Sequence, residues 1–231
     1  MGGQACVLYG AAEFSRDTDI AVLASPDNLE LLRAALRELQ ARRIAVPPFA
    51  LQHLLRGHAI HFRSYHADAL HMRVNVMSVM RGVDDFETLW SRRAQLIGDD
   101  DFLIDVLSLA DLVRAKKTQR DKDWPMIRRL LEADFAATEH PSVEKVKFWL
   151  LESRTHEMLR ELALAHPSFV NELVRIRPLL RFAANDVLSD IEKALHQEEY
   201  AERVADRTYW EPLKAELMAL PQTALQAEED V

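Results

Sequence analysis

The sequence predicts an α+β fold in which a small mixed sheet with its surrounding helices is followed by a helical C-terminal region. Two observations predict this class. Short strand patterns are mixed with helical ones at the start of the chain, whereas from about Leu103 nearly every segment has helical periodicity. The 231 residues include only six glycines and nine prolines, which indicates few tight turns and much helix. We therefore expect two domains, residues 1–101 and residues 102–231.

The first expected elements are a short helix and a strand. Gly2 and Gly3 precede residues Gln4–Glu13, which form the helical pattern. Residues Asp17–Ala24 alternate polar and apolar side chains and then become apolar, which is typical of a half-buried strand. A strand that follows a glycine-led helix indicates that helices and strands alternate in this part of the chain.

The next helix has both a start signal and a buried face. Ser25 can cap the helix, and Pro26 suits its first position. Leucines at positions 29, 32, 36 and 39 form one apolar face. We expect this helix to end near Arg43, before the pair of prolines at positions 47 and 48.

Two more strands are expected at His58–Tyr65 and His71–Val79. In the second, the side chains fall on two faces: Met72, Val74 and Val76 on one, and Arg73, Asn75 and Met77 on the other. A short helix at Asp85–Arg93 and an extended apolar stretch at Phe102–Leu107 follow.

The remainder of the chain is expected to be helical. Ser108 with Asp111 three residues later resembles a capping box and starts a helix that reaches Lys117. Further helical patterns cover residues 122–133, 143–153, 155–165 and 187–205. A last, short amphipathic segment runs from Trp210 to Leu220.

Charge and cysteine content exclude several kinds of protein. The 29 Lys and Arg against 37 Asp and Glu give a formal charge of −8, which repels nucleic acid over the molecule as a whole. Cys6 is the only cysteine, so neither an intramolecular disulfide nor a cysteine-based zinc cluster can form. No apolar run approaches the roughly 20 residues needed to cross a bilayer. We expect a cytoplasmic protein without a membrane partner, whose phosphate chemistry would need a local basic site or a metal.

Asp17 and Asp19 are the strongest candidates for chemistry. One residue separates them within an expected strand, so both carboxylates emerge on the same face. Carboxylate oxygens are hard ligands, and such a pair suits Mg²⁺, or Mn²⁺, that is bridged to substrate phosphates. The Gly2-Gly3 turn before a helix offers free backbone N–H groups to a phosphate. Together these features predict a metal–nucleotide site, although an isolated Asp-Thr-Asp triplet is more often a turn or surface feature.

These motifs resemble those of a known superfamily. The runs Gly2-Gly3-Gln4 and Ser15-Arg16-Asp17-Thr18-Asp19-Ile20 are similar to the signature of the nucleotidyltransferase superfamily with the DNA polymerase β-like fold. The run Arg73-Val74-Asn75-Val76-Met77-Ser78 lies where that family has its third strand. The basic run from Lys116 to Asp123 resembles one found in the minimal and abortive-infection (AbiEii-like) nucleotidyltransferases. The resemblance covers about residues 1–132.

The resemblance implies an activity and a set of site residues. The activity is transfer of a nucleoside monophosphate from an NTP to a hydroxyl acceptor, which is a small molecule, a protein or RNA. By the same resemblance, Asp17 and Asp19 hold Mg²⁺ and act with position 75, while the remaining site residues bind the nucleotide: Gly2, Gly3, Ser15, Arg16, Lys116, Lys117 and Arg120. The three basic residues could equally be a solvated helix end. The resemblance also suggests the toxin half of a toxin–antitoxin pair, with an antitoxin protein as partner.

Two departures from the family pattern affect these expectations. The family usually has a third carboxylate where this chain has Asn75, and an amide carries no charge and cannot act as a base. The alternative is therefore a catalytically inactive nucleotidyltransferase-fold protein with a binding or regulatory role. Family members also have an apolar strand before the Gly-Gly turn, and here only Met1 precedes it. Either the start has been assigned too late, or another chain, such as a second copy of this one, completes the sheet.

Five histidines lie close together in the sequence, at positions 53, 58, 61, 66 and 71. Their spacing does not form a recognised set of metal ligands. Strand alternation places His61 on the face opposite to Ile60 and Phe62, so at most one or two of the five converge. His61 or His66 could line a pocket.

Overall fold

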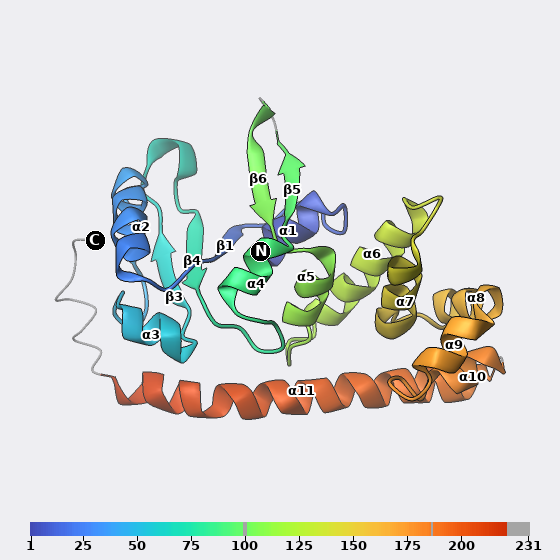
Figure 1. Cartoon of the computed structure of the whole chain (residues 1–231). Coiled ribbons are helices and arrows are strands. Elements are labelled where there is room, and N and C mark those ends of the chain that lie inside the picture. Colours follow the sequence, from blue (N-terminus) through green and yellow to red (C-terminus); the bar gives the residue numbers. More distant parts are fainter. Residues whose placement is uncertain (99–100, 186, 221–231) are drawn as a thin grey trace. The chain divides into compact units, whose positions relative to one another are not determined.

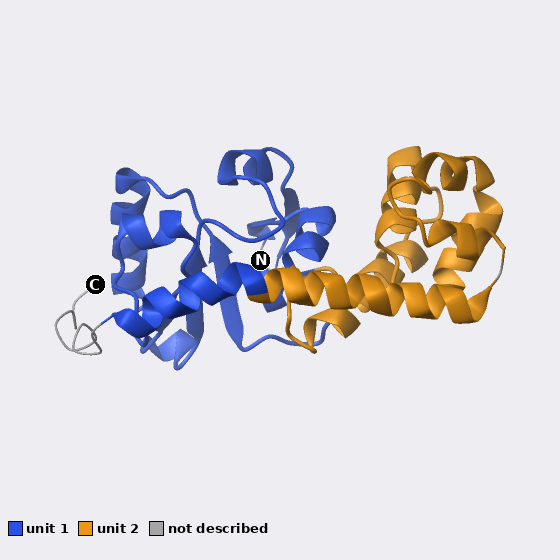
Figure 2. Ribbon diagram, turned by 90° about the horizontal axis from the view of Figure 1, so that it is seen from below, with its two compact units in different colours: residues 1–8, 12–115, 208–231 blue, residues 9–11, 116–207 orange. Residues whose placement is uncertain are grey.

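The computed structural model describes residues 1–98, 101–185 and 187–220. It has a mixed α+β architecture with a small mixed sheet, which confirms the predicted fold class (Figure 1). The chain divides into two compact units (Figure 2). The first consists of residues 1–8, 12–115 and 208–231, and the second of residues 9–11 and 116–207. The predicted division into domains at residues 101 and 102 stays a prediction.

The sheet of the first unit has four strands in the order β1-β4-β3-β2. They are β1 (Asp17–Ala21), β2 (Arg42–Arg43), β3 (Ile60–Arg63) and β4 (Arg73–Met77). Strand β1 runs parallel to β4, and the other neighbours are antiparallel. Among the described residues, β4 is the only strand neighbour of β1, and a further strand beside β1 stays a prediction.

One face of this sheet is apolar and carries the core of the first unit. Helices α2 (Pro26–Glu38) and α3 (Leu51–Arg56) lie beside β3 and β4 (Figure 1). The buried residues that pack together there include Leu36, Leu54, Ile60, Phe62, Val74 and Val76. Ser25 caps α2 as predicted, because its side chain accepts a hydrogen bond from the Asn28 N–H at 3.3 Å. Helix α2 ends before Arg43 because residues 42 and 43 form β2.

Helix α1 (Gly2–Leu8) begins and ends earlier than the sequence predicts. The two glycines belong to the helix itself, and Gly2 has a φ of +64°. The chain turns after Leu8 at Gly10, whose φ is +73°. A glycine with positive φ just after the last turn commonly ends a helix, and the segment from Gly10 to Glu13 does not continue α1.

The rest of the first unit contains α4 (Phe86–Ser91), a hairpin and α5 (Leu109–Ala115). The hairpin pairs β5 (Ala94–Ile97) with β6 (Leu103–Val106) in antiparallel register. The stretch around β6 is extended as predicted, whereas β5 was not predicted from the sequence. The capping box was predicted correctly, since the Ser108 hydroxyl accepts from the Asp111 N–H at 3.2 Å and donates to its carboxylate at 2.7 Å.

The second unit is helical. It contains α6 (Asp123–Ala136), α7 (Val143–Glu152), α8 (His156–Ala165), α9 (Pro167–Leu173), α10 (Leu180–Ala184) and the first part of α11 (Leu188–Ala219). Residues such as Ile127, Trp149 and Leu159 are fully buried in its core. None of the helices in the described part of the chain is both long and apolar enough to span a bilayer.

Helix α11 differs from the prediction because it is one helix of 32 residues. The sequence predicted separate segments at 187–205 and 210–220, and Pro212 lies within the second. A proline inside a helix removes one hydrogen bond and costs about 3 kcal/mol. Within the first unit, Glu216 of the last turns binds the Arg56 guanidinium and His58, and Leu213 is buried. These contacts help to offset the cost of the proline.

Candidate metal and nucleotide site

The two aspartates of β1 lie on the polar face of the sheet. Ile20 packs against the core, so its neighbour Asp19 and the alternate residue Asp17 point to the opposite face. Both aspartates are partly exposed, and the Asp17 side chain is 38% accessible. Two carboxylates are thus held near each other on a surface that solvent and a ligand can reach.

The first turn of α1 lies directly against the Asp19 carboxylate. A Cβ atom built on Gly2 would be 1.7 Å from Asp19 Oδ2 and 2.5 Å from its Cγ, closer than any real contact. The φ of +64° at Gly2 independently disfavours any other residue. The glycine is therefore required both by its conformation and by the carboxylate. The predicted proximity of the Gly-Gly turn to this aspartate is present in the structure.

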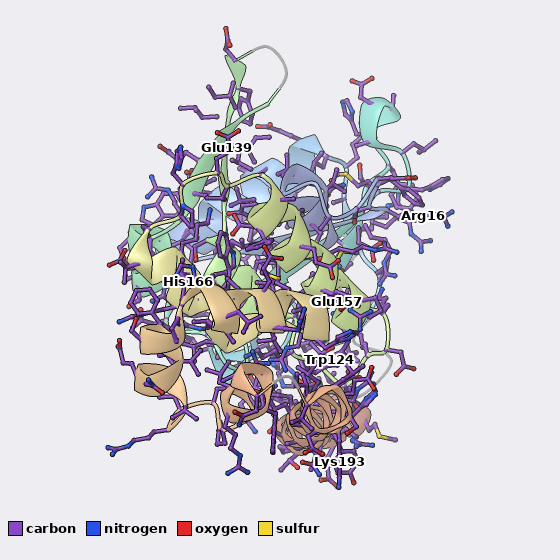
Figure 3. All side chains as sticks on the ribbon, turned by 90° about the vertical axis from the view of Figure 1, so that its right-hand side faces the viewer. Arg16, Trp124, Glu139, Glu157, His166 and Lys193 are labelled. Carbon is purple, nitrogen blue, oxygen red and sulfur yellow. The ribbon has the colours of Figure 1, made fainter. Side chains whose placement is uncertain are left out.

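The second glycine contacts the loop that leads into β1. A Cβ on Gly3 would be 2.3 Å from the Ser15 hydroxyl oxygen. That hydroxyl donates to the Asp17 carbonyl at 2.9 Å, and the Gln4 side chain donates to the Ser15 carbonyl at 3.1 Å. The loop is therefore fixed between the helix and the strand. Arg16 is exposed, and its side chain points away from the ribbon (Figure 3).

Asp19, Asn75 and His61 form a hydrogen-bonded row across three strands. They lie opposite one another in the register of β1, β4 and β3. The Asn75 amide nitrogen donates to Asp19 Oδ1 at 2.7 Å, and the Asn75 oxygen lies 2.7 Å from His61 Nδ1. The Asp19 carboxylate only accepts hydrogen bonds, so the amide nitrogen of Asn75 faces Asp19 and its oxygen faces His61. An amide oxygen also only accepts, so His61 Nδ1 is the donor in this contact.

The hydrogen bonds of this row fix the orientation of the Asn75 amide. Its oxygen faces His61 and its nitrogen faces Asp19, so the amide oxygen is not offered to a cation held by the aspartates. Asn75 is thus hydrogen-bonded to Asp19, and its predicted part in catalysis stays a prediction. The contact of His61 with Asn75 could not be predicted from a local pattern, because only the register of β3 with β4 brings the two residues together.

The donor set that remains fits a cation that also binds substrate. Asp19 Oδ2 and the Asp17 carboxylate are the acidic oxygens of the site, and Arg73 Nε lies 3.9 Å from Asp17. Within residues 1–98, 101–185 and 187–220, no three His, Cys, Asp or Glu side chains are grouped to hold a metal. Two carboxylates alone suit Mg²⁺, which commonly keeps several waters and takes further oxygens from substrate phosphates.

The basic run belongs to the second unit, and its side chains are paired there. Lys116 is 8% exposed, with its Nζ 3.3 Å from Asp123. Arg120 binds the same carboxylate at 2.8 Å, and Lys117 binds Glu152 at 2.7 Å. Burial acts to raise the pKa of Asp123, but the charge of Lys116, the Thr118 hydroxyl and Arg120 outweigh it and lower that pKa. Each of the three basic residues has an internal partner, and their contact with phosphate stays a prediction.

A hollow of about 530 Å³ also lies in the second unit. Its lining mixes cations and acids, including Arg154, Arg203, Glu199 and Asp121. Burial and the neighbouring Arg177 lower the pKa of Arg154, which is bound to Glu198 at 2.8 Å. With both signs of charge along its wall, this hollow shows no preference for an anion.

Comparison of the chain with protein-family models gives no match, and no curated protein matches it significantly. The assignment of a function therefore rests on the geometry of the site and on the resemblance of its motifs.

Proposed function

We propose that this chain is a metal-dependent nucleotidyltransferase that transfers an NMP from an NTP to a hydroxyl acceptor. The approach of Gly2 to Asp19 Oδ2 is the observation that carries the proposal. This contact places the start of helix α1 beside the Asp19 carboxylate, whereas an aspartate that only faces solvent would not require a glycine at position 2. The acceptor would be a small molecule, a protein or RNA.

In this proposal, the site residues have two roles: some hold the metal and others bind the triphosphate. Asp17 and Asp19 would hold Mg²⁺ or Mn²⁺, which when bound neutralises phosphate charge and positions the triphosphate. The first backbone N–H groups of α1 have no partner within the helix, and those at Gly3 and Gln4 would face phosphate oxygens. Arg16 would approach from the exposed loop. In the reaction, the acceptor hydroxyl oxygen would bond to the α-phosphorus and lose its proton to solvent, while the bond from the α-phosphorus to the α–β bridging oxygen breaks and pyrophosphate leaves.

The second candidate is a catalytically inactive protein with the same fold. The orientation of Asn75 favours it, because the position carries no charge and its amide occupies one oxygen of Asp19. A nucleotide could then bind without reacting, and the protein would act through binding or regulation.

Incubation with each α-³²P-labelled NTP and Mg²⁺ or Mn²⁺ separates these candidates. Candidate acceptors are offered as small-molecule, protein and RNA fractions. The enzyme reading predicts labelling that Asp17→Asn and Asp19→Asn each reduce by at least about a thousandfold, because charge stabilisation is the main contribution to such catalysis. Asp27→Asn, on helix α2 over the opposite face, is the matched control and should keep full activity.

Wild-type protein that labels nothing, although it still binds NTP, would support the inactive candidate. Equal activity in Asp19→Asn and wild type would exclude the proposed site. The toxin role is tested separately: expression of the wild type should arrest growth, and expression of Asp19→Asn should not.

A further inference from the structure

Three arginines lie side by side on the polar face of the sheet. In the strand register Arg42 lies opposite Arg63, and Arg63 lies opposite Arg73. Arg73 in turn lies opposite Asp17, the first aspartate of the site. Residues directly opposite one another share a face, so Arg42, Arg63 and Arg73 form one row that ends at the acid pair. We call this row the arginine stripe.

Carboxylates do little to balance the positive charge of the stripe. Like charges directly opposite each other destabilise a sheet, and the stripe contains two such pairs. In the part of the chain that the structure describes, no carboxylate forms an ion pair with Arg42 or Arg63, and the Arg73 contact with Asp17 is long, at 3.9 Å. Arg42 and Arg73 are exposed. In a chain with a formal charge of −8, such a concentration of unneutralised positive charge indicates an anionic ligand.

We propose that the arginine stripe binds the backbone of a single-stranded nucleic acid. Neighbouring strands are about 4.8 Å apart, so the stripe extends about 10 Å across the sheet. A stacked single strand has one phosphate per roughly 3.4 Å, so this length fits roughly three consecutive phosphates. A nucleic acid that follows the stripe has its end at Asp17 and Asp19. If the proposed function holds, the terminal hydroxyl of that nucleic acid is the acceptor, and this part of the inference rests on the proposed function.

An aromatic side chain lies at the far end of the stripe. Tyr65 is 39% exposed, and the Arg42 guanidinium lies 5.2 Å from its ring centroid. Positive side chains next to an exposed aromatic ring are typical of surfaces that bind single strands, where a base stacks on the ring. The combination favours a single-stranded nucleic acid over an acidic protein, which would not need the ring.

The test measures fluorescence anisotropy of a labelled single-stranded RNA and of a DNA with the same sequence. The protein is full length, and EDTA is present so that no transfer occurs. Arg63→Gln and Arg42→Gln are compared with Arg37→Gln, which removes an exposed arginine from α2 on the opposite side of the sheet. All three variants are first checked by thermal unfolding.

We expect Arg63→Gln and Arg42→Gln to weaken binding roughly five- to tenfold at low salt. Each should reduce the slope of log K against log salt by about 0.7, the value for one phosphate contact on a single strand. Their melting temperatures should be unchanged or higher, because a like-charge contact is removed. Arg37→Gln should bind as the wild type does. Binding of RNA, of DNA or of both with these losses supports the proposal, and a preference for one of the two identifies the natural strand.

Three results would overturn the proposal. The first is a wild type that binds neither strand, and the second is an equal loss of affinity in Arg37→Gln. In the third, Arg63→Gln weakens binding of a fluorescent GTP analogue and leaves RNA binding intact, which would assign the stripe to the triphosphate. Failure of the proposed function is distinguishable, because Asp19→Asn would then still bind RNA with wild-type affinity while no form of the protein transfers a nucleotide.

Discussion

The polar face of the sheet and the basic run of the second unit contain similar charged residues in opposite situations. On the sheet, Asp17, Asp19 and Arg63 are partly exposed, Arg42 and Arg73 are exposed, and the contact between Arg73 and Asp17 is long, at 3.9 Å. In the basic run, Lys116 and Asp123 are buried together, and Thr118 and Arg120 complete the hydrogen bonds of the carboxylate. Charges with complete internal partners stabilise a fold, whereas charges held without them are available to a ligand.

The largest expected difference between the regions is in stability. Asp123→Asn removes the partner of the buried Lys116 and should lower the free energy of unfolding by about 3–5 kcal/mol. Asp19→Asn should change it by less than about 1 kcal/mol, because the side chain is partly exposed. Urea unfolding followed by circular dichroism gives both values. A loss for Asp19→Asn as large as that for Asp123→Asn would remove the distinction.

Acid should affect the second unit in a defined direction. Because the pKa of Asp123 in the folded protein lies below its ordinary value of 3.8, its ion pairs contribute fully above that value. Their contribution is lost as the pH falls through the lower, folded-state pKa. The melting temperature of the wild type should therefore decrease below about pH 4 more steeply than that of Asp123→Asn. Parallel curves for the two proteins would contradict this assignment.

Gly2→Ala tests the contact between the helix turn and the carboxylate. A positive φ alone costs about 1–3 kcal/mol for alanine. Gly10→Ala is the matched control, since Gly10 has a φ of +73° and no atom within 4 Å of an added Cβ. Gly2→Ala should lose more stability than the control, and it alone should weaken Mn²⁺ binding, because Asp19 must move. Equal effects of the two substitutions would show that the carboxylate does not depend on this contact.

The smallest expected change is in Mn²⁺ affinity when Asn75, the uncharged site residue of β4, is replaced. Asn75→Asp restores a third carboxylate and should tighten Mn²⁺ binding roughly tenfold, because affinity follows the number of charged ligands. Asn75→Ala removes the hydrogen bond to Asp19 without adding charge and should not tighten it. Isothermal titration calorimetry measures both. Unchanged affinity in Asn75→Asp would indicate that a carboxylate at position 75 does not reach a metal held by Asp17 and Asp19.

Local signals in the sequence were sufficient for many elements. Ser25 with Pro26 and Ser108 with Asp111 marked two helix starts correctly, because capping depends on neighbouring residues only. Helix α11 shows the limit of such local signals: the sequence pattern predicted two segments, whereas the structure has one helix whose last turns contact the first unit through Glu216.

The part of the candidate site that depends on neighbouring residues alone could also be predicted from the sequence. Asp17 and Asp19 share a face through strand alternation alone, and the nearby glycines suggested a close contact. The row from Asp19 through Asn75 to His61, by contrast, depends on how three strands separated in sequence are aligned. So does the arginine stripe. Register of this kind is set by packing of the apolar face, which a local pattern does not specify.

Electron paramagnetic resonance of Mn²⁺ with a non-hydrolysable NTP tests the central claim most directly. We predict that the wild type binds Mn²⁺ together with the nucleotide, and that Asp17→Asn and Asp19→Asn each weaken this binding at least tenfold. The Asp27→Asn protein should bind as the wild type does. Wild-type affinity in both Asp17→Asn and Asp19→Asn would contradict a metal site formed by these two aspartates.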